Sequence, residues 1–163
     1  MKPRFTPLLL SLCLLIPLSV SADSGGDSGS SSDSSNNPWN RQGDPKQVTA
    51  DYEAGYRQLK AGQYREAISS FERVVAVNKQ HAMAYTNMAY SYRQLGNYKR
   101  AIKLYNKALA IEPNLAEAHE YLGGAWLALG KVEEAKKQLA ILEKLDSKLA
   151  EELRADIDRH ERS

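Results

Sequence analysis

The feature that most constrains this chain is a repeat of thirty-four residues. Glycine and alanine recur together at this interval, at Gly62, Gly96 and Gly130 and at Ala67, Ala101 and Ala135. A fixed period of twenty to fifty residues is typical of stacked arrays, in which each unit buries its apolar face only against its neighbours. The sequence therefore predicts three successive units, over residues 48–81, 82–115 and 116–149.

Each unit has the pattern of two helices joined by a tight turn. Apolar residues recur three and four positions apart, as expected for a helix with one buried face, and no segment alternates like a strand. The repeated glycines suit the turn, because glycine adopts left-handed backbone angles at little cost. Pro113 is expected to end the second helix of its unit. The predicted fold class is all-α.

The repeat also resembles a known family. The middle unit carries Tyr85, Met88, Ala89, Tyr92, Gly96, Tyr98, Ala101, Tyr105, Ala108 and Pro113. This pattern and its period resemble the tetratricopeptide repeat. The third unit matches well, with Trp126 where the middle unit has Tyr92, whereas the first departs at Asp51, Gln58 and Lys79. The resemblance covers residues 48–149 and implies an α-solenoid of three helix-turn-helix hairpins.

A further helix is expected to close the array. Leu149, Leu153 and Ile157 form one apolar stripe at four-residue steps, and charged residues occupy the other faces. Repeat arrays need terminal helices with a polar exterior to cover the last exposed core. We therefore expect a capping helix over about residues 149–161 and a tetratricopeptide domain over residues 48–163.

The first twenty-two residues are typical of a cleavable signal peptide. Lys2 and Arg4 precede an apolar run from Leu8 to Val20, and small residues lead up to a cleavage site after Ala22. Thirteen helical residues span only about 20 Å, which is less than the roughly 30 Å of a membrane core. We expect export across the inner membrane, to the periplasm.

Two alternatives for this segment are an uncleaved anchor and a lipoprotein acylated at Cys13, where Leu12 stands in place of the usual small residue. Residues 23–47 are rich in Ser, Gly and Asp and can bury little apolar area, so they are predicted to be a disordered linker. Trp39 stands alone in that linker.

The composition and the histidine pattern argue against several functions. A formal net charge of +2 gives no basic surface of the kind that nucleic-acid binding needs. His81, His119 and His160 are not at metal-ligand spacing, and His119 is expected to pack within its repeat. We predict no enzymatic activity, no cofactor and no metal site.

The family resemblance directs attention to one surface. In tetratricopeptide arrays the first helix of each hairpin lines a concave groove that commonly binds peptides or helices. Reading groove positions across the three units predicts the partner-binding residues Tyr52, Tyr56, Asn87, Tyr90, Arg93 and Tyr121. Tyrosine suits such a surface because it offers a large contact area and loses little conformational entropy. Packing between helices is the alternative role for these rings.

Two further expectations concern the same groove. Gly124, Ala125 and Ala128 are predicted to leave a shallow apolar recess in the third unit. Cytosolic co-chaperones of the family hold a peptide's terminal carboxylate with Lys, Arg and Asn. Here the corresponding positions hold Tyr52, Tyr56, Asn87, Glu117 and Tyr121, of which only Asn87 fits. This sequence therefore predicts a different kind of ligand.

The predicted function is a non-catalytic adaptor of the cell envelope that binds a peptide or helix of a protein partner. One alternative is a self-assembling structural protein. Residues 48–115 carry ten basic and five acidic side chains and residues 116–163 carry eight and eleven, a split that would let copies stack head to tail. Another is a non-catalytic subunit of an envelope enzyme or assembly complex.

Lys99, Lys103 and Lys107 form a stripe that could meet anionic lipid, although a solvated face is the favoured interpretation.

Overall fold

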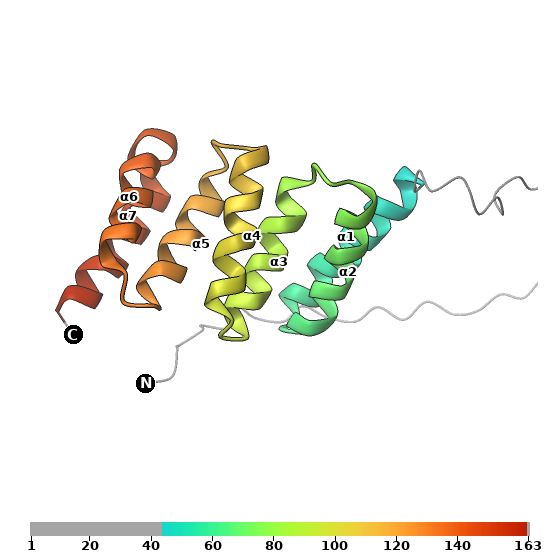
Figure 1. The fold of residues 1–163 in the computed structure, drawn as a ribbon, viewed down its shortest axis with the longest axis horizontal. Coiled ribbons are helices and arrows are strands. Elements are labelled where there is room, and N and C mark those ends of the chain that lie inside the picture. The colour runs from blue at the N-terminus through green and yellow to red at the C-terminus, as the bar shows by residue number, and fades with distance from the viewer. Residues whose placement is uncertain (1–43, 163) are drawn as a thin grey trace, which may run out of the picture. The chain divides into compact units, whose positions relative to one another are not determined.

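The computed structural model describes residues 44–162, which form seven α-helices and no strand. The helices are α1 Pro45–Lys60, α2 Tyr64–Val77, α3 Ala82–Gln94, α4 Tyr98–Ile111, α5 Ala116–Leu127, α6 Val132–Leu145 and α7 Ser147–Glu161 (Figure 1). None of these helices is both long enough and apolar enough to cross a membrane. The predicted signal peptide and most of the predicted linker lie outside the described residues.

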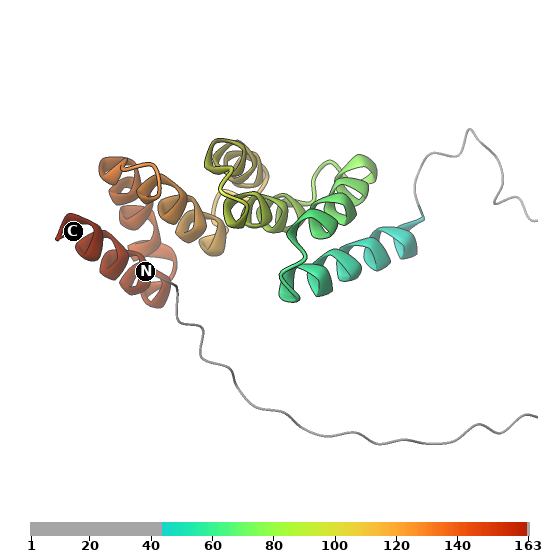
Figure 2. The same cartoon turned by 90° about the horizontal axis from the view of Figure 1, so that it is seen from below.

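The helices stack as hairpins, as predicted. Each of α1/α2, α3/α4 and α5/α6 is a packed pair, and the second helix of each pair also contacts the first helix of the next. The inner helices touch in sequence, α1 with α3, α3 with α5 and α5 with α7, whereas no contact joins α2 to α4 or α4 to α6 in the described part. The array is therefore curved, with α1, α3, α5 and α7 along its inner side (Figure 2). We call this side the inner wall.

The hairpin turns have the backbone that the glycine repeat predicted. Gly62, Gly96 and Gly130 have φ angles of 75°, 76° and 68°. These values lie in the left-handed region, which other residues rarely adopt. α4 ends at Ile111, two residues before Pro113. These local signals set the boundaries of the hairpins.

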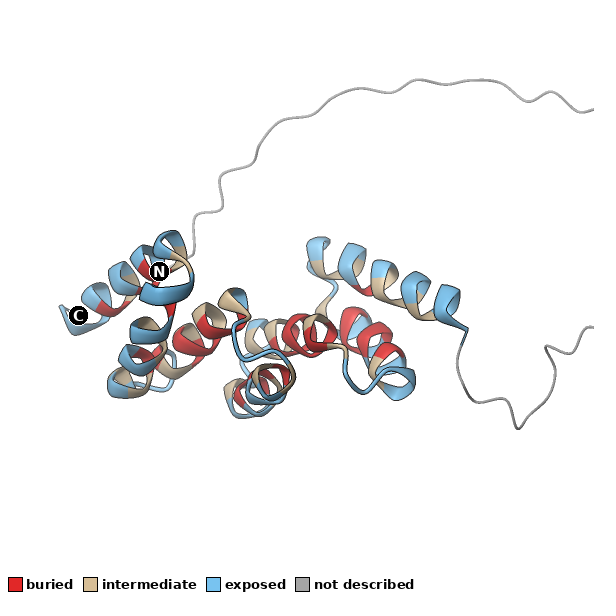
Figure 3. Ribbon diagram, turned by 90° about the horizontal axis from the view of Figure 1, so that it is seen from above, coloured by how far each residue is buried: buried red, intermediate tan, exposed pale blue. Residues whose placement is uncertain are grey.

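Buried positions lie where the helices meet, and they are most continuous along α3 (Figure 3). The repeated alanines are fully buried, which lets neighbouring helices approach closely. Gly55 serves the same purpose in α1, because a Cβ atom there would lie 2.8 Å from the Phe71 ring in α2. The close neighbour of Gly123 is Leu153 of α7 rather than a residue of its own hairpin.

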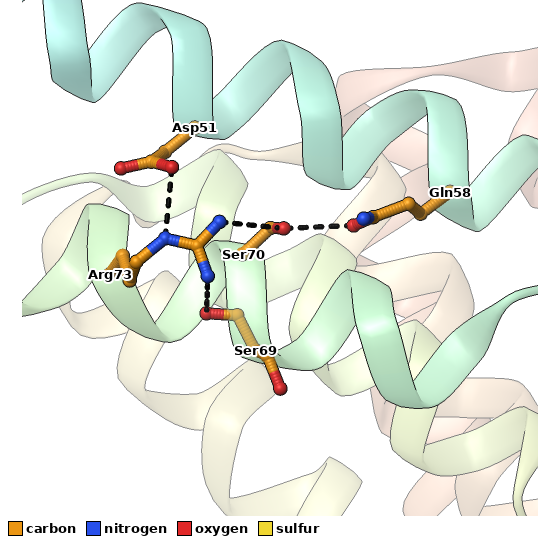
Figure 4. Close-up of polar contacts among 5 residues, drawn as sticks. All are labelled: Asp51, Gln58, Ser69, Ser70 and Arg73. Atoms are coloured by element: carbon orange, nitrogen blue, oxygen red, sulfur yellow. Dashed lines mark hydrogen bonds and ion pairs between the residues drawn. The ribbon is translucent and has the colours of Figure 1, made fainter.

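A polar network joins α1 to α2 in the first repeat (Figure 4). Arg73 Nε donates to Asp51 Oδ1 over 2.9 Å, and Arg73 Nη2 donates to Ser70 Oγ over 3.1 Å. Ser70 Oγ in turn donates to Gln58 Oε1 over 2.8 Å. Asp51 and Gln58 are two of the positions at which this repeat departs from the family pattern. Their departure is compensated by hydrogen bonds that join α1 to α2.

Two predicted boundaries need a small correction, the start of the domain at residue 48 and the start of the capping helix at about residue 149. α1 begins at Pro45 with Asp44 as its N-cap, so residues 45–47 are helical rather than part of a disordered linker. α7 begins at Ser147 instead of Leu149, because Asp146 accepts hydrogen bonds from the backbone of Lys148 and Leu149. The predicted apolar stripe is confirmed, since Leu153 and Ile157 are buried and Leu149 packs beside them.

Candidate functional site

The inner wall holds all six predicted partner-binding residues, on α1, α3 and α5. They differ in how much of each side chain remains accessible. Tyr56 in α1 is the most accessible of the tyrosines, with 46% of its surface exposed, and the Lys60 ammonium lies 5.9 Å from the centre of its ring. Tyr52, Tyr90 and Tyr121 are half-buried. The wall is thus partly aromatic and partly accessible.

Tyr52 and Asn87 mainly join α1 to α3. The Tyr52 ring stacks on His81, with 4.8 Å between ring centres, and burial raises the pKa of the Tyr52 hydroxyl. Asn87 is 8% exposed, and its amide nitrogen donates to the Tyr52 hydroxyl over 3.1 Å. Tyr52 therefore packs between helices, which is the alternative role that the sequence analysis considered for the tyrosines.

Tyr90, Arg93 and Tyr121 form one cluster across α3 and α5. The two rings lie 5.2 Å apart, and the Arg93 guanidinium carbon lies 5.2 Å from the Tyr90 ring centre and 5.6 Å from that of Tyr121. At these distances the ring faces attract the cation. Arg93 has no ion pair within 4 Å among the described residues. Gly124 makes room for it, because a Cβ there would lie 2.7 Å from Arg93 Nη1.

Two polar side-chain atoms are buried without a hydrogen-bond partner in the described part of the chain, Nε of Arg93 itself and the hydroxyl of Tyr105. Tyr105 is fully buried in α4, and its ring centre lies 6.2 Å from that of Tyr121. An unsatisfied buried polar group costs about 1–3 kcal/mol. This corner of the wall is therefore destabilised by its own polar groups.

Glu120 places a largely buried carboxyl group near the same cluster. The pKa of its carboxyl is raised to about 7, mainly because the group is buried; Arg93 opposes the shift, and the carboxylates of Glu152, Asp156 and Glu117 add to it. Removing water from a carboxylate disfavours its charged form, and like charges add to that effect. Glu120 thus titrates close to neutral pH.

A hollow of about 440 Å³ lies beside this cluster, between α3, α5 and α7. It is lined by Arg93, Gly124, Leu127, Ala128, Asp156, Arg159 and His160. The predicted recess thus has Gly124 and Ala128 in its lining, but Ala125 is fully buried and takes no part. Sequence reasoning missed the residues of α7, which was predicted only as a cap. It also treated Tyr105 only as a residue of the repeat pattern and missed its position next to Tyr121.

The histidines are structural where their contacts are described. His119 is buried and packs within the fold, as predicted, with Nε2 donating to the Pro113 carbonyl over 2.9 Å and Nδ1 2.8 Å from Gln138 Oε1. Burial lowers the pKa of His81, which caps α3 through Nδ1. No cluster of three or more potential metal ligands occurs within residues 44–162.

Comparison with known families decides the class of the molecule. Two family models, both described as the tetratricopeptide repeat, match residues 52–116 and 92–157. The chain is a tetratricopeptide repeat protein. The two matches together cover residues 52–157, from the middle of α1 to most of α7, in agreement with the resemblance seen in the middle repeat. No curated protein matches this tetratricopeptide repeat protein.

Solved tetratricopeptide domains share its fold. The first such domain of Spaghetti (RPAP3), solved with an HSP90 peptide, is 28% identical, with a TM-score of 0.66 over 74% of this chain and 97% of that one. The second domain of human RPAP3, solved with an HSP70 peptide, is 27% identical, with a TM-score of 0.64 over 69% and 96%. A Yersinia enterocolitica secretion chaperone, SycD, is 14% identical and shows the fold alone, with a TM-score of 0.67 over 72% and 95%.

Proposed function

We propose that this tetratricopeptide repeat protein is a non-catalytic adaptor that binds a peptide segment or helix of a protein partner along its inner wall. The observation that carries the proposal is the cluster of Tyr90, Arg93 and Tyr121 beside the hollow. Aromatic and arginine side chains supply most of the binding energy at protein interfaces. Two similar domains, at 28% and 27% identity, were solved with bound peptides.

The ligand differs in this proposal from the peptides of those two structures. Only Asn87 matches the residues that grip a terminal carboxylate in co-chaperones of the family, and its amide already donates to Tyr52. Tyr56, Tyr90 and Tyr121 would instead offer rings to the partner's side chains, with Arg93 fixing its register. Asn87, which the sequence placed in the same role, is buried and already bonded to Tyr52. The ligand is thus held by its side chains rather than by its terminus.

We place the adaptor in the cell envelope on the basis of residues 1–22. Their pattern is that of a signal peptide, and the following linker would let the domain search around its partner. The mass of the exported chain tests this part of the proposal. A chain beginning at Asp23 supports it, and an intact Met1 in a chain retained inside the cell contradicts it.

The binding proposal is tested with a partner captured from an envelope extract by the full chain. Replacing Tyr56 and Tyr90 together by Ala should weaken that interaction at least about tenfold, because two anchoring rings are lost. Helicity should be unchanged. The matched control is Val77→Ala with Ile141→Ala, which removes exposed apolar area from the outer helices α2 and α6. Equal binding by both double variants would rule out the inner wall.

A further inference from the structure

The hollow between α3, α5 and α7 contains an arginine whose charge has no counterpart. Arg93 lines the hollow and forms no ion pair within 4 Å in residues 44–162. Its Nε atom is buried without a hydrogen-bond acceptor, as one of two such side-chain atoms in the described residues. Buried polar groups in native structures are nearly always hydrogen-bonded, so an exception calls for an explanation. A guanidinium has only donors, so the missing partner is an acceptor.

The lining of the hollow carries more basic than acidic groups. It holds Arg93, Arg159 and His160 and a single carboxylate, that of Asp156. Asp156 is already paired with Arg159 on its own helix, so it does not compensate Arg93. Charge complementarity therefore favours an anion in the hollow.

Glu120, on α5, opposes this preference from outside the lining. It forms no ion pair within 4 Å with Arg93 in the described chain. Because its pKa is raised to about 7, its carboxyl is protonated in about half of the molecules at neutral pH, which reduces its repulsion of another carboxylate. The group that a ligand meets on the lining is Arg93.

The position of Arg93 fits a carboxylate that approaches the end of the guanidinium. The rings of Tyr90 and Tyr121 flank the guanidinium, with 5.2 Å and 5.6 Å from the ring centres to its carbon. Nε is buried, so a ligand reaches the terminal Nη1 and Nη2 groups, which can donate two parallel hydrogen bonds to one carboxylate. Gly124 and Ala128 add an apolar surface to the lining, against which the methylene groups of an acidic side chain can pack.

We propose that the hollow binds the side-chain carboxylate of a glutamate or aspartate within the partner's segment, with its two oxygens accepting hydrogen bonds from Nη1 and Nη2 of Arg93. The inference rests on the proposed function and names the partner as an acidic segment. The contact differs from the grip on a terminal carboxylate in the co-chaperones. Arg93 is not among the positions compared with that grip, and Asn87, which is, donates to Tyr52 instead.

The test measures the binding of three labelled nonapeptides to the full chain at about 0.15 M salt, where attraction between distant charges is screened. The first peptide is blocked at both ends and built from glutamate, leucine and serine. The second has glutamine in place of every glutamate, and the third is the glutamine peptide with a free terminal carboxylate. The glutamate peptide should bind at least about tenfold more tightly than the other two, as expected for a hydrogen-bonded charge pair.

Arg93→Met should remove most of this preference, because it deletes the charge and keeps an unbranched side chain beside the two rings. The matched control is Arg65→Met, the same change at an exposed position of α2, which should retain the full preference. Ala128→Glu changes an exposed residue of the lining and places a carboxylate of the chain itself in the hollow. It should also remove the preference, so the test does not depend on the folding of Arg93→Met. Circular dichroism of every variant verifies the helical fold.

Several results would overturn the inference. These are an equal affinity for the glutamate and glutamine peptides, no binding of the glutamate peptide, equally tight binding of the peptide with the free terminus, or an undiminished preference in Arg93→Met or Ala128→Glu. An equal loss in Arg65→Met would show that the preference arises from net charge rather than from the hollow. A concentration-dependent dimer that dissociates in Arg93→Met would show that a second copy occupies the hollow, which also overturns the assignment. If the captured partner still depends on Tyr56 and Tyr90 in any of these cases, the adaptor function stands and only the acidic ligand is wrong.

Discussion

Gly123 and Gly124 are neighbours in α5, yet the two positions are limited by different surroundings. A Cβ at Gly123 would lie 2.6 Å and 2.8 Å from the two methyl carbons of Leu153, a residue of α7 that is buried in the core. A Cβ at Gly124 would meet only the end of the Arg93 side chain, at 2.7 Å. Leu153 is fixed by its packing, whereas a guanidinium at the edge of a hollow can move.

The two glycines should therefore respond in opposite ways to alanine. We expect Gly123→Ala to lower the free energy of unfolding by about 1–3 kcal/mol, because a packed core does not accept an extra carbon. Gly124→Ala should raise it by up to about 1 kcal/mol, since alanine favours helix over glycine. Urea denaturation of both variants provides the measurement. Similar changes of the same sign would contradict the distinction between a fixed and a movable neighbour.

Glu120 gives the domain a specific dependence on pH. Its carboxyl has a pKa of about 7 in the folded chain against an ordinary value of 4.5, so between these values the folded state holds a proton that the unfolded state has lost. The contribution of Glu120 to stability is thus complete below pH 4.5 and is lost as the pH rises through 7, a change of up to about 3 kcal/mol.

Glu120→Gln removes this titration and keeps a side chain of similar size. The gain in stability of the variant over the native chain should therefore be small at pH 4.5, grow with pH and level off above pH 7. Thermal unfolding of both chains across this range measures the difference, in which the titrations of all other groups largely cancel. A difference that is constant with pH would show that Glu120 is not desolvated as described.

At the scale of the elements, the hairpins followed from local spacing. The glycine turns, the buried alanines and the end of α4 before Pro113 depend on residues close in sequence, and the structure has each of them as predicted. The start of α1 had an equally local signal, since Asp44 followed by Pro45 is a favoured beginning for a helix. The Ser/Gly-rich composition of the preceding segment concealed it.

The candidate site was only partly predictable, because it depends on how helices cross. Spacing placed Tyr90, Arg93 and Tyr121 on one wall, but their stacking depends on side-chain conformations that no repeat pattern specifies. The place of Asp156 in the lining of the hollow depends on the angle at which α7 packs against α5. An apolar stripe at four-residue steps identifies the buried face of a terminal helix, but it does not specify what the other faces contact.

The whole domain is an array in which each helix contacts only near neighbours. α7 touches α5 and α6, while α1 touches α2 and α3, and no contact links the two ends in the described chain. In such arrays the stability is close to a sum of hairpin energies and interfaces between adjacent units. A destabilising substitution at one end of the array should therefore lower the local stability of the other end by a smaller amount.

Leu153→Ala tests this directly, because it removes a fully packed side chain from α7 at a cost of about 2–5 kcal/mol. We expect hydrogen exchange of backbone amides to accelerate more in α6 and α7 than in α1 and α2, since opening the last hairpin leaves the first interface intact. Phe71→Ala in α2 should produce the opposite gradient, because its ring packs against Gly55 at the other end of the array. If both variants accelerate exchange equally in all seven helices, the domain unfolds as one cooperative unit, and its inner wall is assembled only as a whole.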